Sequence, residues 1–422
     1  MRANNPQHNN QMKLPLHLQH SLCLGAILGS LCLATPARAQ VNLLQTATVS
    51  QMPVTQIQLS WKSQGAGTVI QIYRRALGQE GGSTWGNPIA TAVAPINSYA
   101  DTGITPGIAY EYQLYCSKSG ADVGYAFLAA GIGVSLVENR GKILLVVDQT
   151  LSAPLAAELT QLEQDLAGDG WTVIRTDSPR MTGASSGVDM VGQQNLKAWI
   201  QSQYNADPAN VKAVFLFGRL PIVRSGWSIP DGHYYAPRVA DVYYADMTGT
   251  WTDTDDDDSP SQGGGTNVPG DGKYDQDNLP NNRVDLQLGR VDLAEMTTWP
   301  LSEVELMRNY LRKDHNWRQG LITTPATGIC ENWDLRTEGY GLESLFGGAS
   351  TVFAPMGIPL AQTQTTPYRW VADFGDYNGN DYFYRNCQAM FTINFGSFKQ
   401  NWDAANNPMR DMLCITGVRL TD

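Results

Sequence analysis

Thiols and imidazoles are the first side chains in this sequence that could carry out catalysis. Beyond residue 39 the chain has four cysteines and two histidines, at spacings that match no zinc site. A thiol is a weak nucleophile until a base or a cation lowers its pKa, so cysteine chemistry needs an imidazole nearby. In an oxidising compartment one or two disulfides could form instead, in pairings that the sequence does not define. These residues are Cys116, Cys330, Cys387, Cys414, His233 and His315.

Carboxylates are the second group of candidates. Asp253 opens a six-residue run with five aspartates, and three more aspartates follow in a glycine-rich stretch. Flexible, oxygen-rich loops suit Ca²⁺. The run is not an EF-hand, because its sixth residue is Asp258 rather than glycine and no glutamate stands at the twelfth position. A solvated acidic loop is the alternative. The candidate calcium ligands are Asp253, Asp255, Asp257, Asp271, Asp275 and Asp277.

The charge balance excludes one class of partner. The 422 residues include 29 Lys and Arg against 40 Asp and Glu, which gives a net charge of −11. The first 39 residues hold three basic groups and no acid, so the rest of the chain carries −14. A surface this acidic repels phosphate backbones, and we expect no nucleic-acid partner.

The first 39 residues have the features of a secretory signal peptide. The apolar stretch from Leu22 to Leu33 follows a polar leader and is too short to span a bilayer. An Ala-Arg-Ala step then predicts cleavage after Ala39. Cys23 and Cys32 each follow leucine, which favours plain export over lipid attachment. We expect a bacterial protein that is secreted or held at the cell surface without a transmembrane anchor.

Residues 45–135 predict an all-β sandwich. Short runs alternate apolar and polar residues between glycine- and proline-containing turns, which is typical of antiparallel strands. Trp61 in an early strand and the run TPGIAYEYQLY from Thr105 to Tyr115 resemble a fibronectin type III module. That resemblance places Tyr110 to make the corner hydrogen bond of such sandwiches. The module implies a spacer or an adhesion unit. The expected strands cover residues 55–61, 68–74 and 110–116.

Residues 140–422 alternate strand and helix patterns, which predicts an α/β domain with a mostly parallel sheet. Ligands bind such sheets beyond the carboxyl ends of the strands, here near Asp148, Asp177 and Gly218-Arg219. Ser152 is a candidate helix cap, and Ser302 with Glu305 predicts a capping box. The expected strands are 142–148, 171–175, 211–218, 285–292 and 390–394, and the expected helices are 151–166, 193–204, 302–318, 341–346 and 407–413.

The order of motifs in this region resembles the gingipain-type cysteine peptidases. KILLVVD, GWTVIRTD and VKAVFLFG are followed by the most specific stretch, DVYYADMTGTW to LGRVD, within residues 241–292. The resemblance covers residues 140–422 and implies a caspase-like α/β fold. It also implies secretion, structural calcium in the acidic loops, and proteins or peptides as partners outside the cell. The chain stops at Asp422, soon after the nucleophile-position strand, so we expect a truncated or shortened member.

The catalytic positions depart from that family. Its cysteine lies just past a strand, and the best register places Ser397 there. Its Gly-His-Gly turn would fall within residues 373–381, which contain no histidine. Cys387 and Cys414 lie near Ser397 in sequence, and His233 lies in a loop beyond the strand at 211–218. These residues are candidate substitutes for the dyad, whereas His315 is interpreted as structural.

Three functional hypotheses remain open. The first is an exported, non-catalytic peptidase homologue that acts as a surface or interaction protein. The alternative is an active secreted endopeptidase of the cysteine type, pairing Cys387 or Cys414 with His233, or one that uses Ser397. The third, a carbohydrate-binding or adhesive protein, would require an exposed aromatic platform.

Overall fold

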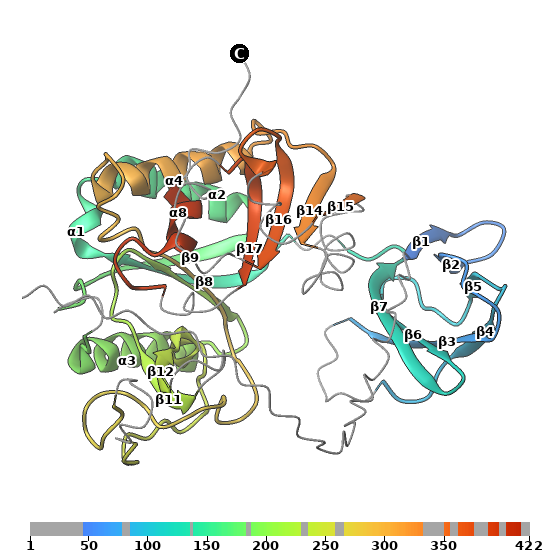
Figure 1. The fold of residues 1–422 in the computed structure, drawn as a ribbon, viewed down its shortest axis with the longest axis horizontal. Coiled ribbons are helices and arrows are strands. Elements are labelled where there is room, and N and C mark those ends of the chain that lie inside the picture. Colours follow the sequence, from blue (N-terminus) through green and yellow to red (C-terminus); the bar gives the residue numbers. More distant parts are fainter. Residues whose placement is uncertain are drawn as a thin grey trace, which may run out of the picture. The chain divides into compact units, whose positions relative to one another are not determined.

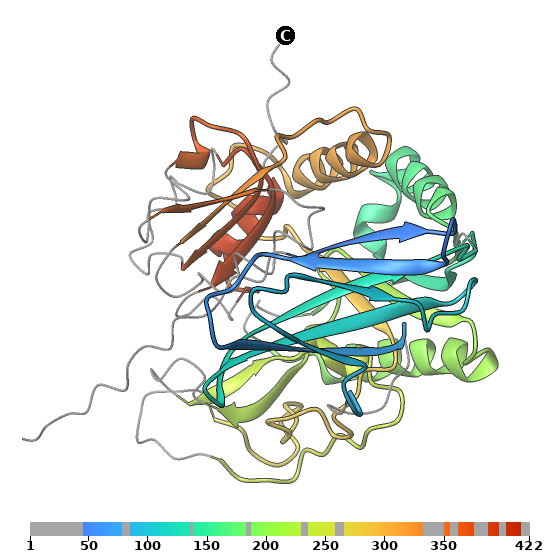
Figure 2. The same cartoon turned by 90° about the vertical axis from the view of Figure 1, so that its right-hand side faces the viewer.

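The computed structural model describes most of the chain beyond residue 44, and Figures 1 and 2 show its ribbon in two views. The described residues are 45–77, 85–135, 138–182, 187–228, 235–257, 266–331, 350–354, 362–374, 387–395 and 402–414. The predicted signal peptide and the helix expected at 341–346 lie outside them, and so does His233.

The strands between residues 45 and 131 form two antiparallel sheets. One sheet has the order β1 (Gln45–Ser50), β2 (Gln56–Trp61) and β5 (Ser98–Asp101). The other has the order β4 (Ala90–Val93), β3 (Thr68–Ala76), β6 (Ala109–Lys118) and β7 (Ala121–Gly131). Alternate residues of β2, β3 and β6 are buried in one shared apolar core, as the period-two pattern predicts.

The predicted corner hydrogen bond is present. The backbone N–H of Thr105 donates to the Tyr110 hydroxyl at 2.9 Å, which ties the turn before β6 to the strand itself. Beneath it, the buried Asp101 carboxylate accepts from the Tyr112 hydroxyl and from Arg74 Nη1, both at 2.8 Å. These polar contacts hold the end of β5 against β3 and β6.

The next region contains a four-stranded parallel sheet in the order β13 (Gln287–Val291), β10 (Val211–Phe217), β8 (Gly141–Asp148) and β9 (Trp171–Ser178). Helices cover both of its faces. Residues 143, 145 and 147 of β8 pack with α2 (Ala156–Gly168) and α4 (Glu303–Arg318), which lie side by side in both views (Figures 1 and 2). Residues 144 and 146 pack with α3 (Met190–Ala206) and the short helix η1 (Asp241–Tyr244). This double burial explains why β8 reads as an unbroken apolar run.

The single helix expected at 151–166 is two helices. A short α1 (Gln149–Ser152) ends before Pro154, and α2 starts at Ala156. The cap predicted at Ser152 is wrong, because the N-cap of α1 is Asp148, whose carboxylate accepts from the Thr150 backbone N–H at 2.9 Å. At α4 the prediction is confirmed: Ser302 and Glu305 form both hydrogen bonds of a capping box.

A second parallel sheet has the order β15 (Ser350–Ala354), β14 (Thr327–Glu331), β16 (Tyr368–Phe374) and β17 (Ala389–Phe395). It precedes α8 (Pro408–Cys414), and a two-stranded antiparallel ribbon of β11 (Arg224–Ser228) and β12 (Ala236–Val239) lies earlier in the chain. The Trp317 ring on α4 meets the Phe391 ring of β17 edge-on, with centroids 5.1 Å apart.

Lys197 is a buried lysine that joins α3 to η1. Its ammonium donates to the backbone carbonyls of Tyr243 and Asp246, at the end of η1, and lies 4.8 Å from the Tyr243 ring centroid. Burial lowers its pKa to about 8, although Asp246 and Asp285 oppose the shift.

This buried amine makes stability depend on pH. Between pH 8 and 10 the folded chain releases the Lys197 proton while the unfolded chain keeps it, so the free energy of unfolding rises with pH. We expect a gain of about 1 kcal/mol from pH 7 to pH 9 from this group. Burial also lowers the pKa of Lys313 to about 8, so Lys313 adds a stability gain of its own over the same pH range. The Lys197→Met variant should therefore keep the gain from Lys313 and lose the gain from Lys197. Urea unfolding at both pH values measures it, and an equal gain in the variant would contradict the assignment.

Candidate functional site

The first parallel sheet has a topological switch point between β8 and β10. The chain passes from β8 to β9 on one side and then to β10 on the other side of β8. In open α/β sheets, ligand sites lie in the crevice beyond the carboxyl ends of the strands at such a point. Asp148 ends β8 and Gly218-Arg219 follows β10, so the predicted edge residues flank this position. Asp177 on β9 instead has a partly exposed side chain paired with Arg175.

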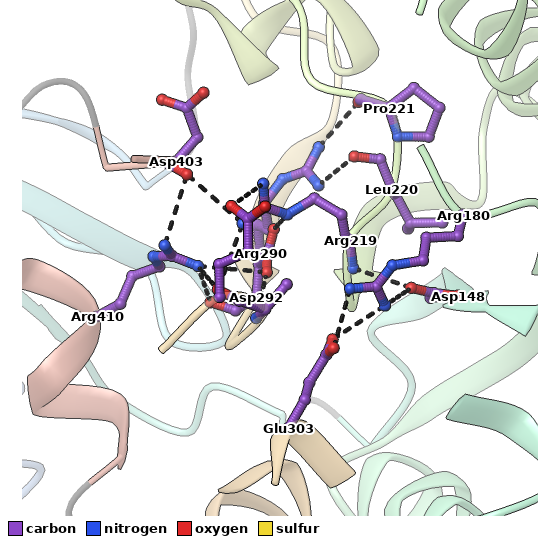
Figure 3. A network of polar contacts seen from close by, with 12 residues as sticks. Asp148, Arg180, Arg219, Leu220, Pro221, Arg290, Asp292, Glu303, Asp403 and Arg410 are labelled. Atoms are coloured by element: carbon purple, nitrogen blue, oxygen red, sulfur yellow. Dashed lines mark hydrogen bonds and ion pairs between the residues drawn. The ribbon is translucent and has the colours of Figure 1, made fainter. Parts of the chain in front are cut away.

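Asp148 is the most enclosed acid at the switch point, and its side chain has no exposed surface. Its Oδ2 accepts from Arg180 Nη1 at 2.8 Å and from the Arg219 backbone N–H at 3.2 Å (Figure 3). Arg180 also donates to both carboxylate oxygens of Glu303, in the first turn of α4, at 3.1 and 2.9 Å. Burial alone would lower the pKa of Arg180, but its bonds to Glu303 and the nearby Asp148 outweigh burial and raise it. Arg180 therefore links β8 to α4 as a permanent cation.

Asp292 is the second buried acid and follows β13 directly. It lies between two buried guanidinium groups (Figure 3): Arg219 Nε is 2.7 Å from its Oδ2, and Arg410 Nη1 is 3.5 Å from its Oδ1. Arg410, on α8, also donates to the carbonyls of Ala294 and Ala404, both at 2.6 Å. Burial lowers the pKa of Arg410, although Asp292 opposes the shift. The pair of guanidiniums thus connects the loop after β10 to α8.

Asp403 continues the network. Its carboxylate is paired with Arg224 of β11, and its carbonyl accepts from Arg219 and Arg410, each at 3.5 Å. Burial raises the pKa of Asp403, although the charges of Arg224 and Arg219 oppose this shift. Arg290 forms a separate pair with Asp241, at 2.6 and 2.8 Å, and its guanidinium lies 5.4 Å from the Trp402 ring centroid.

The switch point is therefore occupied by the chain's own paired charges. Every acid in the network has at least one guanidinium partner, and these ion pairs join β8, β10, β13, α4 and α8. Such an arrangement orders this edge of the sheet.

The candidate nucleophiles among the described residues are enclosed. The four cysteines beyond residue 39 are buried and form no disulfide. Burial raises the pKa of Cys387, whose Sγ accepts from the Ala389 backbone N–H at 3.5 Å. Cys414, the last residue of α8, belongs to the apolar core that also contains residues of β8, α2 and α4. Both thiols fit the structural role rather than that of an activated nucleophile.

Of the two histidines beyond residue 39, the structure describes only His315. His315 Nδ1 lies 2.9 Å from the buried carboxylate of Asp165, at the interface of α2 and α4, which agrees with its structural interpretation. His233 and Ser397 lie outside the described residues, and their roles stay predictions.

The second sheet contains the two strands after which the sequence resemblance predicts the positions of a catalytic dyad. β16 and β17 are parallel neighbours in register, with Asp373 opposite Asn394 and Phe374 opposite Phe395. The structure describes neither residues 375–386, which follow β16, nor residues 396–401, which follow β17.

The aspartates of the acidic loops accept hydrogen bonds from residues of the same and neighbouring loops. Asp253 accepts from the backbone N–H groups of Gly270 and Gly272, both at 2.8 Å, and Asp271 accepts from Lys273. Asp275 accepts from Thr254, and Asp277 accepts from the Trp227 backbone N–H at 2.7 Å. Acids including Asp255 surround Asp257, whose pKa is raised by burial and by these charges.

Across the described residues, no group of three or more His, Cys, Asp or Glu side chains is placed to hold a metal ion. Structural calcium at these loops stays a prediction.

Sequence reasoning missed most of the ion-pair network. Asp292 carried a usable signal, because it directly follows β13, a strand of the same parallel sheet in which β8 ends at Asp148. Arg180, Asp403 and Arg410 carried none, since each lies in a loop or helix far along the chain from its partner.

Comparisons with known proteins show only faint likenesses. No protein-family model matches the sequence, and no curated protein matches it. A cytokine receptor complex matches at 15% identity and a TM-score of 0.17, over 21% of this chain and 50% of that one. Pectate lyase PelI from Erwinia chrysanthemi matches at 13% identity and a TM-score of 0.19, over 26% and 33%. A β-glucuronidase from Ruminococcus gnavus matches at 10% identity and a TM-score of 0.17, over 42% and 37%. The chain spans half or less of the length of these proteins, and such scores support no statement about fold or function.

Within the described part of the chain, no helix is both long and apolar enough to cross a membrane.

Proposed function

We propose that this is an exported surface or interaction protein built on a gingipain-like α/β scaffold, and that it does not cleave peptides. The observation that supports the proposal is the parallel pairing of β16 with β17, whose last paired residues are Phe374 and Phe395. Beyond these strands the sequence has Ser397 where the resemblance implies cysteine, and residues 362–414 contain no histidine. A serine without a neighbouring base stays protonated and reacts slowly.

The environment of the thiols supports the same function. Cys387 and Cys414 are both buried, and burial raises the pKa of Cys387, so the thiolate needed for attack is disfavoured. The network around Asp148 and Asp292 adds support, since these buried carboxylates form ion pairs with Arg180 and Arg219. A charge-paired α/β region and a β-sandwich in the same chain suit the recognition of extracellular proteins or peptides.

Peptide hydrolysis by the purified protein tests the proposal. We expect no turnover of fluorogenic substrates ending in Arg, Lys or Asp, with Ca²⁺ present, because no thiol or hydroxyl is activated by an imidazole. The matched variants are Ser397→Ala, Cys387→Ala and Cys414→Ala. Circular dichroism establishes that each sample is folded. Turnover that disappears in one variant alone would identify a nucleophile and contradict the proposal in favour of an active endopeptidase.

A further inference from the structure

The outer face of the sheet β4-β3-β6-β7 carries a cluster of aromatic side chains. Alternate residues of β3, β6 and β7 point away from the core, and the strand register places them in rows across the sheet. Tyr73 lies opposite Gln113, which lies opposite Phe127, and in the next row Tyr115 lies opposite Tyr125. With Gln71 opposite Tyr115, these two rows across three adjacent strands hold four aromatic residues and two carboxamides.

These rings form a continuous surface with Trp85, which precedes β4. The ring centroids of Trp85 and Phe127 are 6.0 Å apart, and those of Tyr115 and Tyr125 are 5.0 Å apart. Tyr125 and Phe127 are nearly parallel, with an interplanar angle of 5° and centroids 6.5 Å apart. Each of these two residues is 54% exposed. An exposed aromatic cluster of this kind on a soluble protein marks a binding surface.

The face carries a shallow hollow of about 520 Å³ that is widely open to solvent. Aromatic rings line most of it, and Asn87 and Gln113 supply the carboxamides. The volume lies within the usual range for small-ligand pockets, about 300–1,000 Å³.

The charges beside the hollow are paired with each other. Arg75 lies with its guanidinium 4.1 Å from the Trp85 ring centroid and forms an ion pair with Glu111 at 2.6 Å. The Trp85 ring is held by this stacked cation, while Glu111 neutralises the charge. The hollow therefore presents aromatic faces and neutral hydrogen-bonding groups rather than a net charge.

From this chemistry we propose that the β-sandwich binds a neutral oligosaccharide on this face. The C–H faces of sugar rings pack on the electron-rich faces of aromatic rings, and two nearly parallel exposed rings suit successive sugar units. Asn87 and Gln113 can each donate to and accept from sugar hydroxyls. Because Arg75 is already paired with Glu111, an acidic sugar gains no counter-charge here. The site uses only the sandwich and is independent of the proposed lack of peptidase activity.

Affinity electrophoresis of the full-length protein tests the site. The gels contain mixed-linkage β-glucan, xylan, galactomannan or starch, with polygalacturonate as the acidic comparison. We expect at least one neutral polysaccharide to retard the protein, with Tyr125→Ala and Trp85→Ala, two residues that line the hollow, weakening the apparent affinity about tenfold or more. Trp85→Phe keeps an aromatic face and should retain most of the binding. Val93→Ala, an exposed residue on β4 that does not line the hollow, is the matched control.

Circular dichroism confirms folding of each variant, and titration with the corresponding hexasaccharide by calorimetry gives the affinities. Three outcomes would overturn the proposal. They are no retardation by any neutral polysaccharide, retardation by polygalacturonate alone, and equal binding by wild type and the folded Tyr125→Ala and Trp85→Ala variants. A proline-rich peptide that binds in place of every sugar would assign the face to peptide recognition instead.

Discussion

Replacing Asp292 with asparagine is expected to lower the free energy of unfolding by about 3–5 kcal/mol, the usual cost of breaking a buried ion pair. The Asp292 carboxylate is fully buried and faces both Arg219 and Arg410, whose side chains are only 5% and 3% exposed. Asparagine keeps the volume and removes the charge, so two guanidinium groups stay buried without their shared counter-ion. The loss therefore reports electrostatics rather than a cavity.

Urea unfolding monitored by circular dichroism measures this effect. The matched control is Glu158→Gln, which breaks the pair between Glu158 and Arg308 at 2.6 Å, where the Arg308 side chain is 40% exposed. Solvent screens that pair, so we expect a loss below about 1 kcal/mol. Equal losses in Asp292→Asn and Glu158→Gln would show that the network at the sheet edge contributes no more than a surface contact.

Gly218→Ala is expected to be the most damaging small substitution at the switch point, at about 2–5 kcal/mol. Gly218 adopts φ +95°, a conformation that L residues with a side chain rarely take. A Cβ at this position would lie 2.5 Å from Asp148 Cβ and 2.8 Å from Leu151 Cδ1. Backbone strain and steric overlap thus act together. The overlap would displace Asp148, whose carboxylate binds Arg180.

Gly289→Ala is the matched control for this variant. Gly289 lies on the neighbouring strand β13, where an added Cβ has no atom within 4 Å. We expect a change within about 0.5 kcal/mol there, as for an open strand position. Thermal unfolding of the two variants beside wild type makes the comparison. A Gly218→Ala protein as stable as the Gly289→Ala protein would mean that the loop after β10 relaxes freely.

Local signals in the sequence predicted the regular elements well. The apolar run at β8, the period-two strands β2, β3 and β6, and the Ser302 capping box all appear where expected. Each depends on residues a few positions apart, so a short window of sequence contains the information. The assignment of these elements to a fibronectin type III module and a caspase-like domain rests on resemblance and stays a prediction.

The errors lie where distant residues compete with a local pattern. The leucines from Leu151 to Leu166 keep helical spacing, yet the helix breaks at Pro154. Asp148, at the end of β8, caps the short helix that Ser152 was expected to start. Because Asp148 also binds Arg180 and the Arg219 backbone, its position follows from tertiary contacts that no local pattern records.

The sequence by itself determined the net charge, the alternation of strands and helices, and the absence of histidine from residues 362–414. Only the tertiary structure decided that Asp292 is shared by Arg219 and Arg410, and that Tyr125, Phe127 and Trp85 form one exposed surface. The physical reason is range. Propensity and periodicity act between near neighbours in the chain, whereas ion pairs and aromatic surfaces depend on strand register and on which side chains water can still reach.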